Sequence, residues 1–130
     1  MYKKNWMCAK LYRTGDRMLV ISTEYRGGVF FVRLRGELTK DTIYKLDNRV
    51  TKKVEALGIC NLVFNVTNLK FIDYKGINKF LYNYELVRNN NGRVLLCGNN
   101  INIKEKLKKS RLLNYIYEIS DELCAFKILY

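Results

Sequence analysis

The 130-residue chain contains no histidine and no proline. Without histidine it lacks the commonest general base and every Ser-His or Cys-His nucleophile pair, so we expect no enzymatic activity. No Cys-x-x-Cys pair occurs among the four cysteines, Cys8, Cys60, Cys97 and Cys124. Because thiols spaced this widely make a poor metal site, we expect no metal and no cofactor, and we expect Cys60 and Cys97 to pack as small hydrophobic side chains.

Long apolar runs are also missing. The longest ones, residues 29–32 and 94–97, fall far short of the roughly 18 residues that indicate a membrane span. No apolar segment of the signal-peptide kind follows the basic start of the chain. The length and the 48% of hydrophobic residues suit one domain with one core. We predict a soluble cytoplasmic protein in which residues 1–17 form an extension or irregular element and residues 18–130 form the domain.

Negative charge is scarce, since 24 lysines and arginines stand against 12 acidic residues. The excess is concentrated in residues 1–18 and in residues 99–114, each with five basic residues and one acidic residue. Such clusters are either surfaces for nucleic acid, anionic membrane or an acidic partner, or solvated faces with no partner. We favour solvated faces, because neither cluster has the regularly interleaved aromatic residues of a groove that binds single strands.

The hydrophobic pattern predicts alternating strands and helices. Strands are expected over residues 18–25, 29–35, 61–66, 93–97 and 115–119. In the second of them the alternation places Phe30, Val32 and Leu34 on one buried face. Apolar residues at steps of three and four predict two longer helices, one with Ile43, Leu46, Val50, Val54 and Leu57 on its inner face and one with Ile77, Phe80, Leu81, Tyr84 and Val87. Shorter helices are expected over residues 101–109 and from a Ser120 cap through residue 128.

This order, β-β-α-β-α-β-α-β-α, belongs to the α/β class. Paired glycines between the first two strands predict a hairpin, and helices that cross between the later strands predict parallel pairing. We therefore expect a single domain with a mostly parallel mixed sheet of about five strands and about four helices.

The chain between residues 62 and 77 is the strongest candidate for a functional site, because it predicts a buried strand, a short loop and the start of a helix. Asp73 stands where its carboxylate can accept hydrogen bonds from the free N–H groups of that helix. The N-terminus of a helix carries a partial positive charge, so it favours negatively charged groups that dock there. Gly76 is expected to allow close packing of this helix against a strand.

Three features together resemble the STAS domain of bacterial anti-sigma factor antagonists: Gly36-Glu37-Leu38 after the second strand, Phe71-Ile72-Asp73 shortly before Gly76, and the Gly92 turn before residues 93–96. The likeness runs from about residue 18 to residue 129. It implies a STAS-like fold and a regulatory protein that binds an anti-sigma factor with serine kinase activity, so as to influence sigma-factor-dependent transcription.

The chain departs from the family at the residue that carries the switch. In the family a serine follows the aspartate, and its phosphorylation adds negative charge that weakens docking. Here Tyr74 occupies the serine position and Lys75 follows it, so no phosphoacceptor is expected and serine phosphorylation should not control docking. Tyr74 could be a target of an unrelated tyrosine kinase, a hydrophobic anchor, or a residue at a site whose switch was lost, and we favour the last two.

The resemblance implies a partner-binding surface made of Asp73, Tyr74, Lys75 and Gly76, with a weaker contribution from Glu37, Thr39 and Asp41. Asp73 could instead be a helix cap alone, and Glu37 and Thr39 are as well suited to capping as to partner contact. Two alternatives to binding an anti-sigma factor stay open. One is binding of nucleic acid or anionic membrane by the basic clusters, and the other is a self-associating, non-phosphorylated scaffold in a larger signalling assembly.

Overall fold

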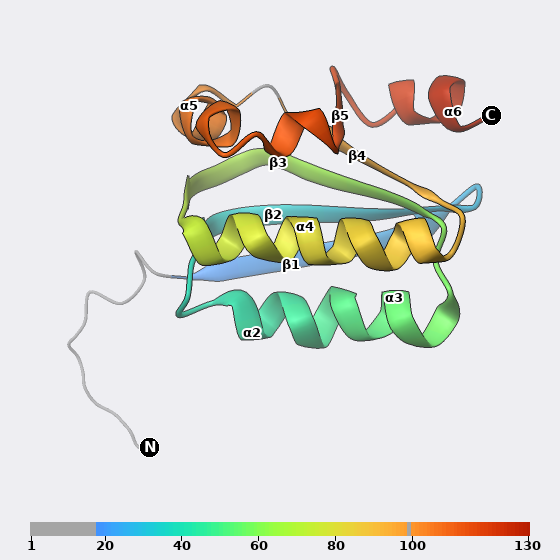
Figure 1. Cartoon of the computed structure of the whole chain (residues 1–130), viewed down its shortest axis with the longest axis horizontal. Helices are drawn as coiled ribbons and strands as arrows, with labels where there is room; N and C mark the ends of the chain where they lie inside the picture. The colour runs from blue at the N-terminus through green and yellow to red at the C-terminus, as the bar shows by residue number, and fades with distance from the viewer. Residues whose placement is uncertain (1–17, 99) are drawn as a thin grey trace.

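We describe the protein from a computed structural model, which describes residues 18–98 and 100–130. The expected extension over residues 1–17 and Cys8 lie outside these residues. Five strands form one sheet in the order β1-β2-β3-β4-β5 (Figure 1). The strands are β1 (Leu19–Arg26), β2 (Val29–Leu38), β3 (Asn61–Ile72), β4 (Arg93–Cys97) and β5 (Tyr117–Ile119). The first two are antiparallel and the later pairs are parallel, which confirms the predicted mixed sheet.

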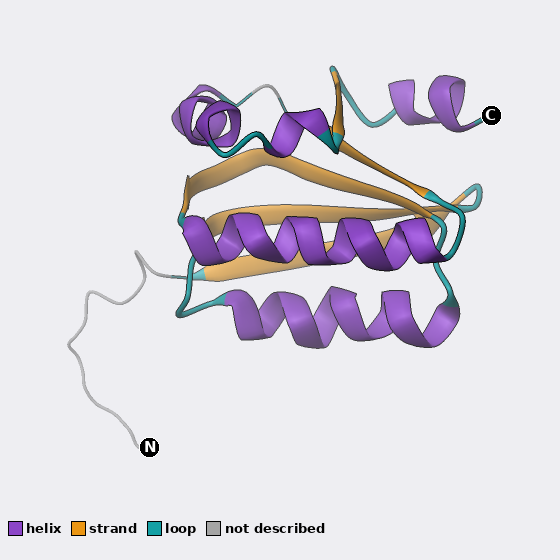
Figure 2. Ribbon diagram, in the orientation of Figure 1, coloured by secondary structure: helices purple, strands orange, loops and turns teal. Residues whose placement is uncertain are grey.

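Four helical segments follow the predicted order (Figure 2). The first joins α2 (Ile43–Leu46), a π-helical turn (Asp47–Thr51) and α3 (Lys52–Leu57). The others are α4 (Tyr74–Asn89), α5 (Ile101–Lys109) and α6 (Cys124–Leu129), with a 3₁₀ turn, Leu112–Asn114, between the last two. None of the helices in the described part of the chain is long and apolar enough to cross a membrane.

One face of the sheet packs against α2 through α5. Phe30, Val32 and Leu34 lie on this face, as predicted, and Phe64 of β3 contacts Phe80 of α4 with ring centroids 4.5 Å apart. The helices contribute Leu46, Val50, Val54, Ile77, Phe80, Val87, Ile103 and Leu107. Leu57 is an exception to the predicted pattern: it is 67% exposed, because the helix ends there at Gly58 in the left-handed conformation.

The opposite face carries a second, smaller core that the alternation did not predict. Val29 and Phe31 are fully buried there, together with Val63, Leu95, Cys97, Ile119 and Ala125. Phe126 of α6 covers them, with its ring centroid 5.8 Å from that of Phe31. Burial raises the pKa of the Cys97 thiol to about 12. Cys97 packs as a small hydrophobe, as expected, whereas the same expectation for Cys60 is wrong because Cys60 is exposed.

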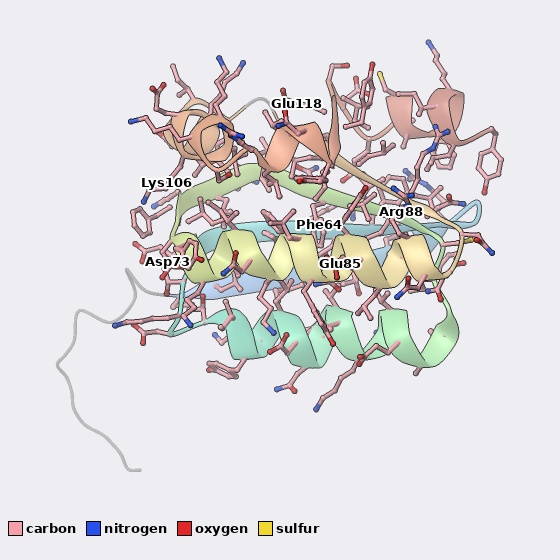
Figure 3. All side chains as sticks on the ribbon, in the orientation of Figure 1. Phe64, Asp73, Glu85, Arg88, Lys106 and Glu118 are labelled. Atoms are coloured by element: carbon pink, nitrogen blue, oxygen red, sulfur yellow. The ribbon has the colours of Figure 1, made fainter. Side chains whose placement is uncertain are left out.

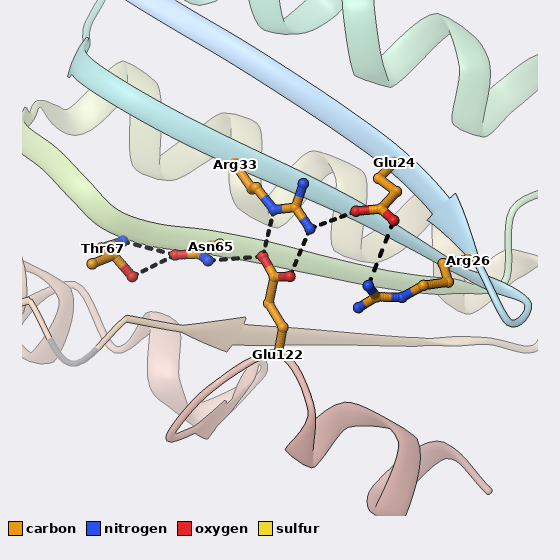
Figure 4. A network of polar contacts seen from close by, with 6 residues as sticks. All are labelled: Glu24, Arg26, Arg33, Asn65, Thr67 and Glu122. Carbon is orange, nitrogen blue, oxygen red and sulfur yellow. Dashed lines mark hydrogen bonds and ion pairs between the residues drawn. The ribbon is translucent and has the colours of Figure 1, made fainter.

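A polar network fastens the segment before α6 to this second face (Figure 4). Glu122 accepts hydrogen bonds from Nε and Nη2 of Arg33, both at 2.8 Å, and from Nδ2 of Asn65 at 2.8 Å. Arg33 Nη2 also donates to Glu24 at 2.7 Å. Hydrogen bonds from Arg33 hold the pKa of Glu122 below its usual range, while the two carboxylates raise the pKa of Arg33.

The predicted boundaries need three corrections. Strands β2 and β3 run on to Leu38 and Ile72, because residues 35–38 pair with residues 68–72 through register shifts that keep the ladder going. The last strand starts at Tyr117, after the 3₁₀ turn. The last helix starts at Cys124, whose backbone N–H donates to Asp121 Oδ1 at 3.0 Å, so the side chain that caps the backbone at its start is Asp121 and not Ser120.

Candidate partner-binding surface

Asp73 is the single residue between β3 and α4, and its carboxylate joins two loops. Oδ1 accepts a hydrogen bond from the N–H of Gly76 at 2.9 Å, which confirms the predicted cap. Oδ2 accepts from the N–H of Lys40 at 2.9 Å, and the Asp73 N–H donates to the carbonyl of Leu38 at 3.1 Å. The side chain and the backbone N–H of Asp73 therefore hold the end of β2, and the loop after it, against the start of α4.

The loop after β2 has its own hydrogen bonds, made by two threonines. Thr42 Oγ1 accepts from the N–H of Thr39 at 2.9 Å and donates to the carbonyl of Glu37 at 2.8 Å. Thr39 Oγ1 accepts from the N–H of Asp41 at 3.2 Å. Both threonines are buried, whereas Asp41 is exposed and Glu37 is half-buried. Of the three weaker candidates, Thr39 therefore holds the loop, and Glu37 and Asp41 are the ones that solvent can reach.

Gly76 lies where the first turn of α4 packs closely against the ends of β2 and β3. A Cβ atom at this position would lie 2.5 Å from the carbonyl oxygen of Leu38 and 2.9 Å from Cγ1 of Ile72. Any larger side chain would push the helix away from the sheet, so the prediction that Gly76 allows close packing is confirmed. Gly76 is buried, so it does not itself reach solvent at this surface.

The residues that do reach solvent at this end of the molecule are aromatic and basic. Tyr74 is 72% exposed, and Lys75 beside it is exposed as well. Phe71, at the end of β3, is 41% exposed and lies under the ammonium group of Lys106, with Nζ 4.1 Å from the ring centroid. Figure 3 shows Lys106 and Asp73 at the same end of the molecule.

A shallow pocket of about 270 Å³ extends this surface from β3 onto α5. Its lining consists of Phe71, Ile72, Asn102, Ile103, Glu105, Lys106 and Lys109. The sequence predicted α5 as a separate basic helix and did not indicate that it adjoins the loop at Asp73. More than 30 positions separate Phe71 from Lys106, so no local pattern could have placed the two together.

Asn100 holds α5 in this position, although no pattern in the sequence predicted this role. Its Oδ1 accepts from the N–H of Asn102 at 2.9 Å, which caps α5. Its Nδ2 donates to the carbonyls of Val66, at 2.7 Å, and Leu69. These carbonyls lie in the stretch of β3 where the pairing with β2 shifts register. A capping asparagine could have been recognised at the start of the basic helix, but its bonds to β3 could not.

Comparisons with known proteins agree with this architecture. The family model described as the STAS domain matches residues 20–124. An anti-sigma F factor antagonist from Paenibacillus polymyxa is 27% identical over 107 residues, which cover 82% of this chain and 92% of the relative.

Solved structures show the same fold. The chain resembles the Bacillus cell fate determinant SpoIIAA in its phosphorylated form with a TM-score of 0.67 and 16% identity, covering 84% of this chain and 99% of SpoIIAA. It resembles an anti-sigma factor antagonist from Mycobacterium paratuberculosis with a TM-score of 0.78 and 17% identity, covering 87% and 95% of the two chains.

Proposed function

This chain belongs to the STAS domain family, and from that premise we propose that it is an anti-sigma factor antagonist that docks on its partner through residues 73–76. The observation that carries the proposal is the position of Asp73. Its carboxylate accepts hydrogen bonds from the N–H groups of both Gly76 and Lys40, which joins the loop after β2 to the start of α4. A prearranged surface loses little conformational entropy on binding.

The exposed side chains favour a particular kind of partner surface. Tyr74 and Phe71 are large aromatic groups of the type that anchors protein interfaces. Lys75 and Lys106 place positive charge beside them. We expect a partner that receives the Tyr74 ring in an apolar pocket bordered by carboxylates, because complementary charge speeds association and excludes wrong partners. The proposed partner is an anti-sigma factor of the serine kinase type.

Docking in this proposal is constitutive. A serine kinase brings a short side chain to the transferred phosphate, whereas the Tyr74 phenol places its oxygen several bonds further from the backbone. Lys75 also keeps the start of α4 positive, which suits permanent contact with an acidic group. We therefore propose that the partner binds this chain both when the partner carries ATP or ADP and when it carries no nucleotide.

Calorimetry with candidate kinase-type anti-sigma factors from the same genome tests the docking. We expect a complex with one of them, and a loss of at least tenfold in affinity for Tyr74→Ala and for Lys75→Glu. Lys52→Glu makes the same charge change at an exposed position of α3 and should leave the affinity unchanged. If no candidate binds with or without nucleotide, or if all three variants behave alike, the proposed docking surface is wrong.

Incubation of the complex with ATP, followed by mass spectrometry, tests whether phosphorylation by the partner controls docking. The wild type should take up no phosphate, while Tyr74→Ser should fold normally and become a substrate of the partner kinase. Phosphate on wild-type Tyr74, accompanied by weaker binding, would show that the chain is switched after all.

A further inference from the structure

An open pocket of about 350 Å³ lies at the other end of α4 from the candidate partner-binding surface. In Figure 3, Arg88 marks this end and Asp73 the opposite one. The pocket is formed by the last turns of α4, the start of β4, the approach to β5 and one residue of α6. Its lining consists of Tyr84, Arg88, Arg93, Val94, Leu95, Tyr115, Tyr117 and Ile128. The volume falls within the range of about 300 to 1,000 Å³ that is common for small-ligand sites.

Aromatic rings form one part of the wall. Tyr115 and Tyr117 are 56% and 63% exposed, so their rings are available to a ligand. Tyr84 meets Tyr115 edge to face, with centroids 5.8 Å apart. Exposed aromatic rings are suited to stacking against flat groups.

Two arginines form the polar part of the wall. Nη1 of Arg88 donates to the hydroxyl of Tyr84 at 2.7 Å, and the guanidinium lies 5.6 Å from the Tyr84 ring centroid. Arg93 uses one N–H in a long bond, 3.4 Å, to the carbonyl of Ile128. A guanidinium has five N–H donors, so both side chains keep donors for an anionic group. Of the described residues that line the pocket, two are basic and none is acidic.

We propose that this pocket binds single-stranded nucleic acid, with bases stacked on Tyr115 and Tyr117 and backbone phosphates held by Arg88 and Arg93. Neighbouring aromatic and cationic groups are what a flexible strand needs, because its bases offer free ring faces and its phosphates repeat beside them. A double helix stacks its bases on one another and offers the tyrosines no free faces. The net charge of +12 adds a general attraction for such a ligand.

Binding in this pocket differs from binding by the two basic clusters of the sequence. Those clusters lie in residues 1–18 and 99–114 and lack regularly interleaved aromatic residues, whereas the fold brings the tyrosines and arginines of this pocket together from three separate segments. A simple anion site would need the arginines but not the exposed rings of Tyr115 and Tyr117. Variants of the two tyrosines can therefore distinguish the binding of single-stranded nucleic acid from the binding of any polyanion.

Fluorescence anisotropy with labelled oligouridine and oligothymidine of about ten nucleotides, and with a duplex of the same length, tests the proposal. Binding of either single strand, at least tenfold tighter than binding of the duplex, is expected, and the two strands show whether RNA or DNA is preferred. Tyr115→Leu and Tyr117→Leu should each weaken binding about tenfold, whereas Tyr115→Phe and Tyr117→Phe keep the ring and should bind like the wild type.

The double variant Arg88→Gln and Arg93→Gln should weaken binding and make the slope of log K against log salt shallower by about 1.4, the value for two lost phosphate contacts. Lys108→Gln with Lys109→Gln removes the same charge from α5 and should change binding little. Three results would overturn the proposal: no binding of single strands, equal binding of inorganic polyphosphate with no effect of the Tyr→Leu changes, or a larger loss in the α5 variant. Binding of the anti-sigma factor should survive in all the pocket variants, so the two proposals can fail separately.

Discussion

The two faces of the sheet are covered by very different amounts of structure. One face packs against α2 through α5, and the side chains between them are almost entirely apolar. Of the described helices, only α6 covers the other face, and the segment before it is fastened by the network of Glu24, Arg33, Asn65 and Glu122. Figure 4 shows this network, with the C-terminal segment at the bottom of the view.

This difference separates two sources of stability. Burial of apolar surface on the helix-covered face does not depend on pH and is lost only when the fold is lost. The α6 face depends in part on charged groups, and Arg33 keeps about a third of its side chain exposed. We therefore expect the α6 face to be weakened by single charge changes that leave the helix-covered face intact.

The largest loss of stability is expected for Phe64→Ala on the helix-covered face. Phe64 is fully buried between the sheet and α4 (Figure 3), so truncation removes buried surface and leaves a cavity beside Phe80. The free energy of unfolding, from urea denaturation, should fall by about 3 to 5 kcal/mol. Leu57→Ala, at an exposed position of α3, should change it by less than about 0.5 kcal/mol. Similar values for the two would contradict the assignment of the main core.

A smaller loss is expected for Glu122→Gln on the α6 face. The change removes the charge from the hydrogen bonds with Arg33, and the free energy of unfolding should fall by about 1 to 3 kcal/mol. Alkylation of Cys97, whose pKa burial raises to about 12, should become faster as α6 opens more often. Glu118→Gln alters an exposed carboxylate of β5 and serves as the control. If it is as destabilising as Glu122→Gln, the network does not fasten α6.

Lowering the pH should remove the stabilisation that the Arg33–Glu122 hydrogen bonds give to the wild type. The hydrogen bonds from Arg33 hold the folded-state pKa of Glu122 below its ordinary value of 4.5. The stabilisation is therefore fully present above pH 4.5 and is lost as the pH falls through the lower folded-state pKa. The difference in unfolding free energy between the wild type and Glu122→Gln should shrink over that interval. A difference that stays constant would show that the Gln variant lost packing rather than charge.

The smallest loss is expected for Asp73→Ala, at the edge of the helix-covered face. The change removes the cap of α4 and the bond to Lys40, and should cost about 1 kcal/mol of unfolding free energy. Asp73→Asn keeps an oxygen that can accept from Gly76 and should recover most of the loss. Equal losses for the two variants would mean that the negative charge matters more than the capping bond.

Most of the fold could be predicted, because strands and helices of this chain carry clear local patterns. The hairpin at Gly27 and the inner face of α4 follow from residues that are neighbours in sequence, and the Asp73 cap needs only Gly76, three positions later. The wrong strand boundaries have a non-local cause. The pairing of residues 35–38 with residues 68–72 extended two strands beyond their apparent ends, because a ladder between distant segments leaves no periodic signature in either one.

The order of the elements, the resemblance to the family and the residue at the switch position could all be read from the sequence, where Tyr74 and Lys75 are visible without any structure. Which distant residues are neighbours in space depends on the tertiary structure. It brought Lys106 over Phe71 at one end of α4, gathered Arg88, Arg93 and Tyr117 at the other, and joined Arg33 to Glu122 across 89 positions. The physical reason is that hydrogen bonds, charges and ring contacts act over a few ångströms in space, whereas a sequence records distance along the chain.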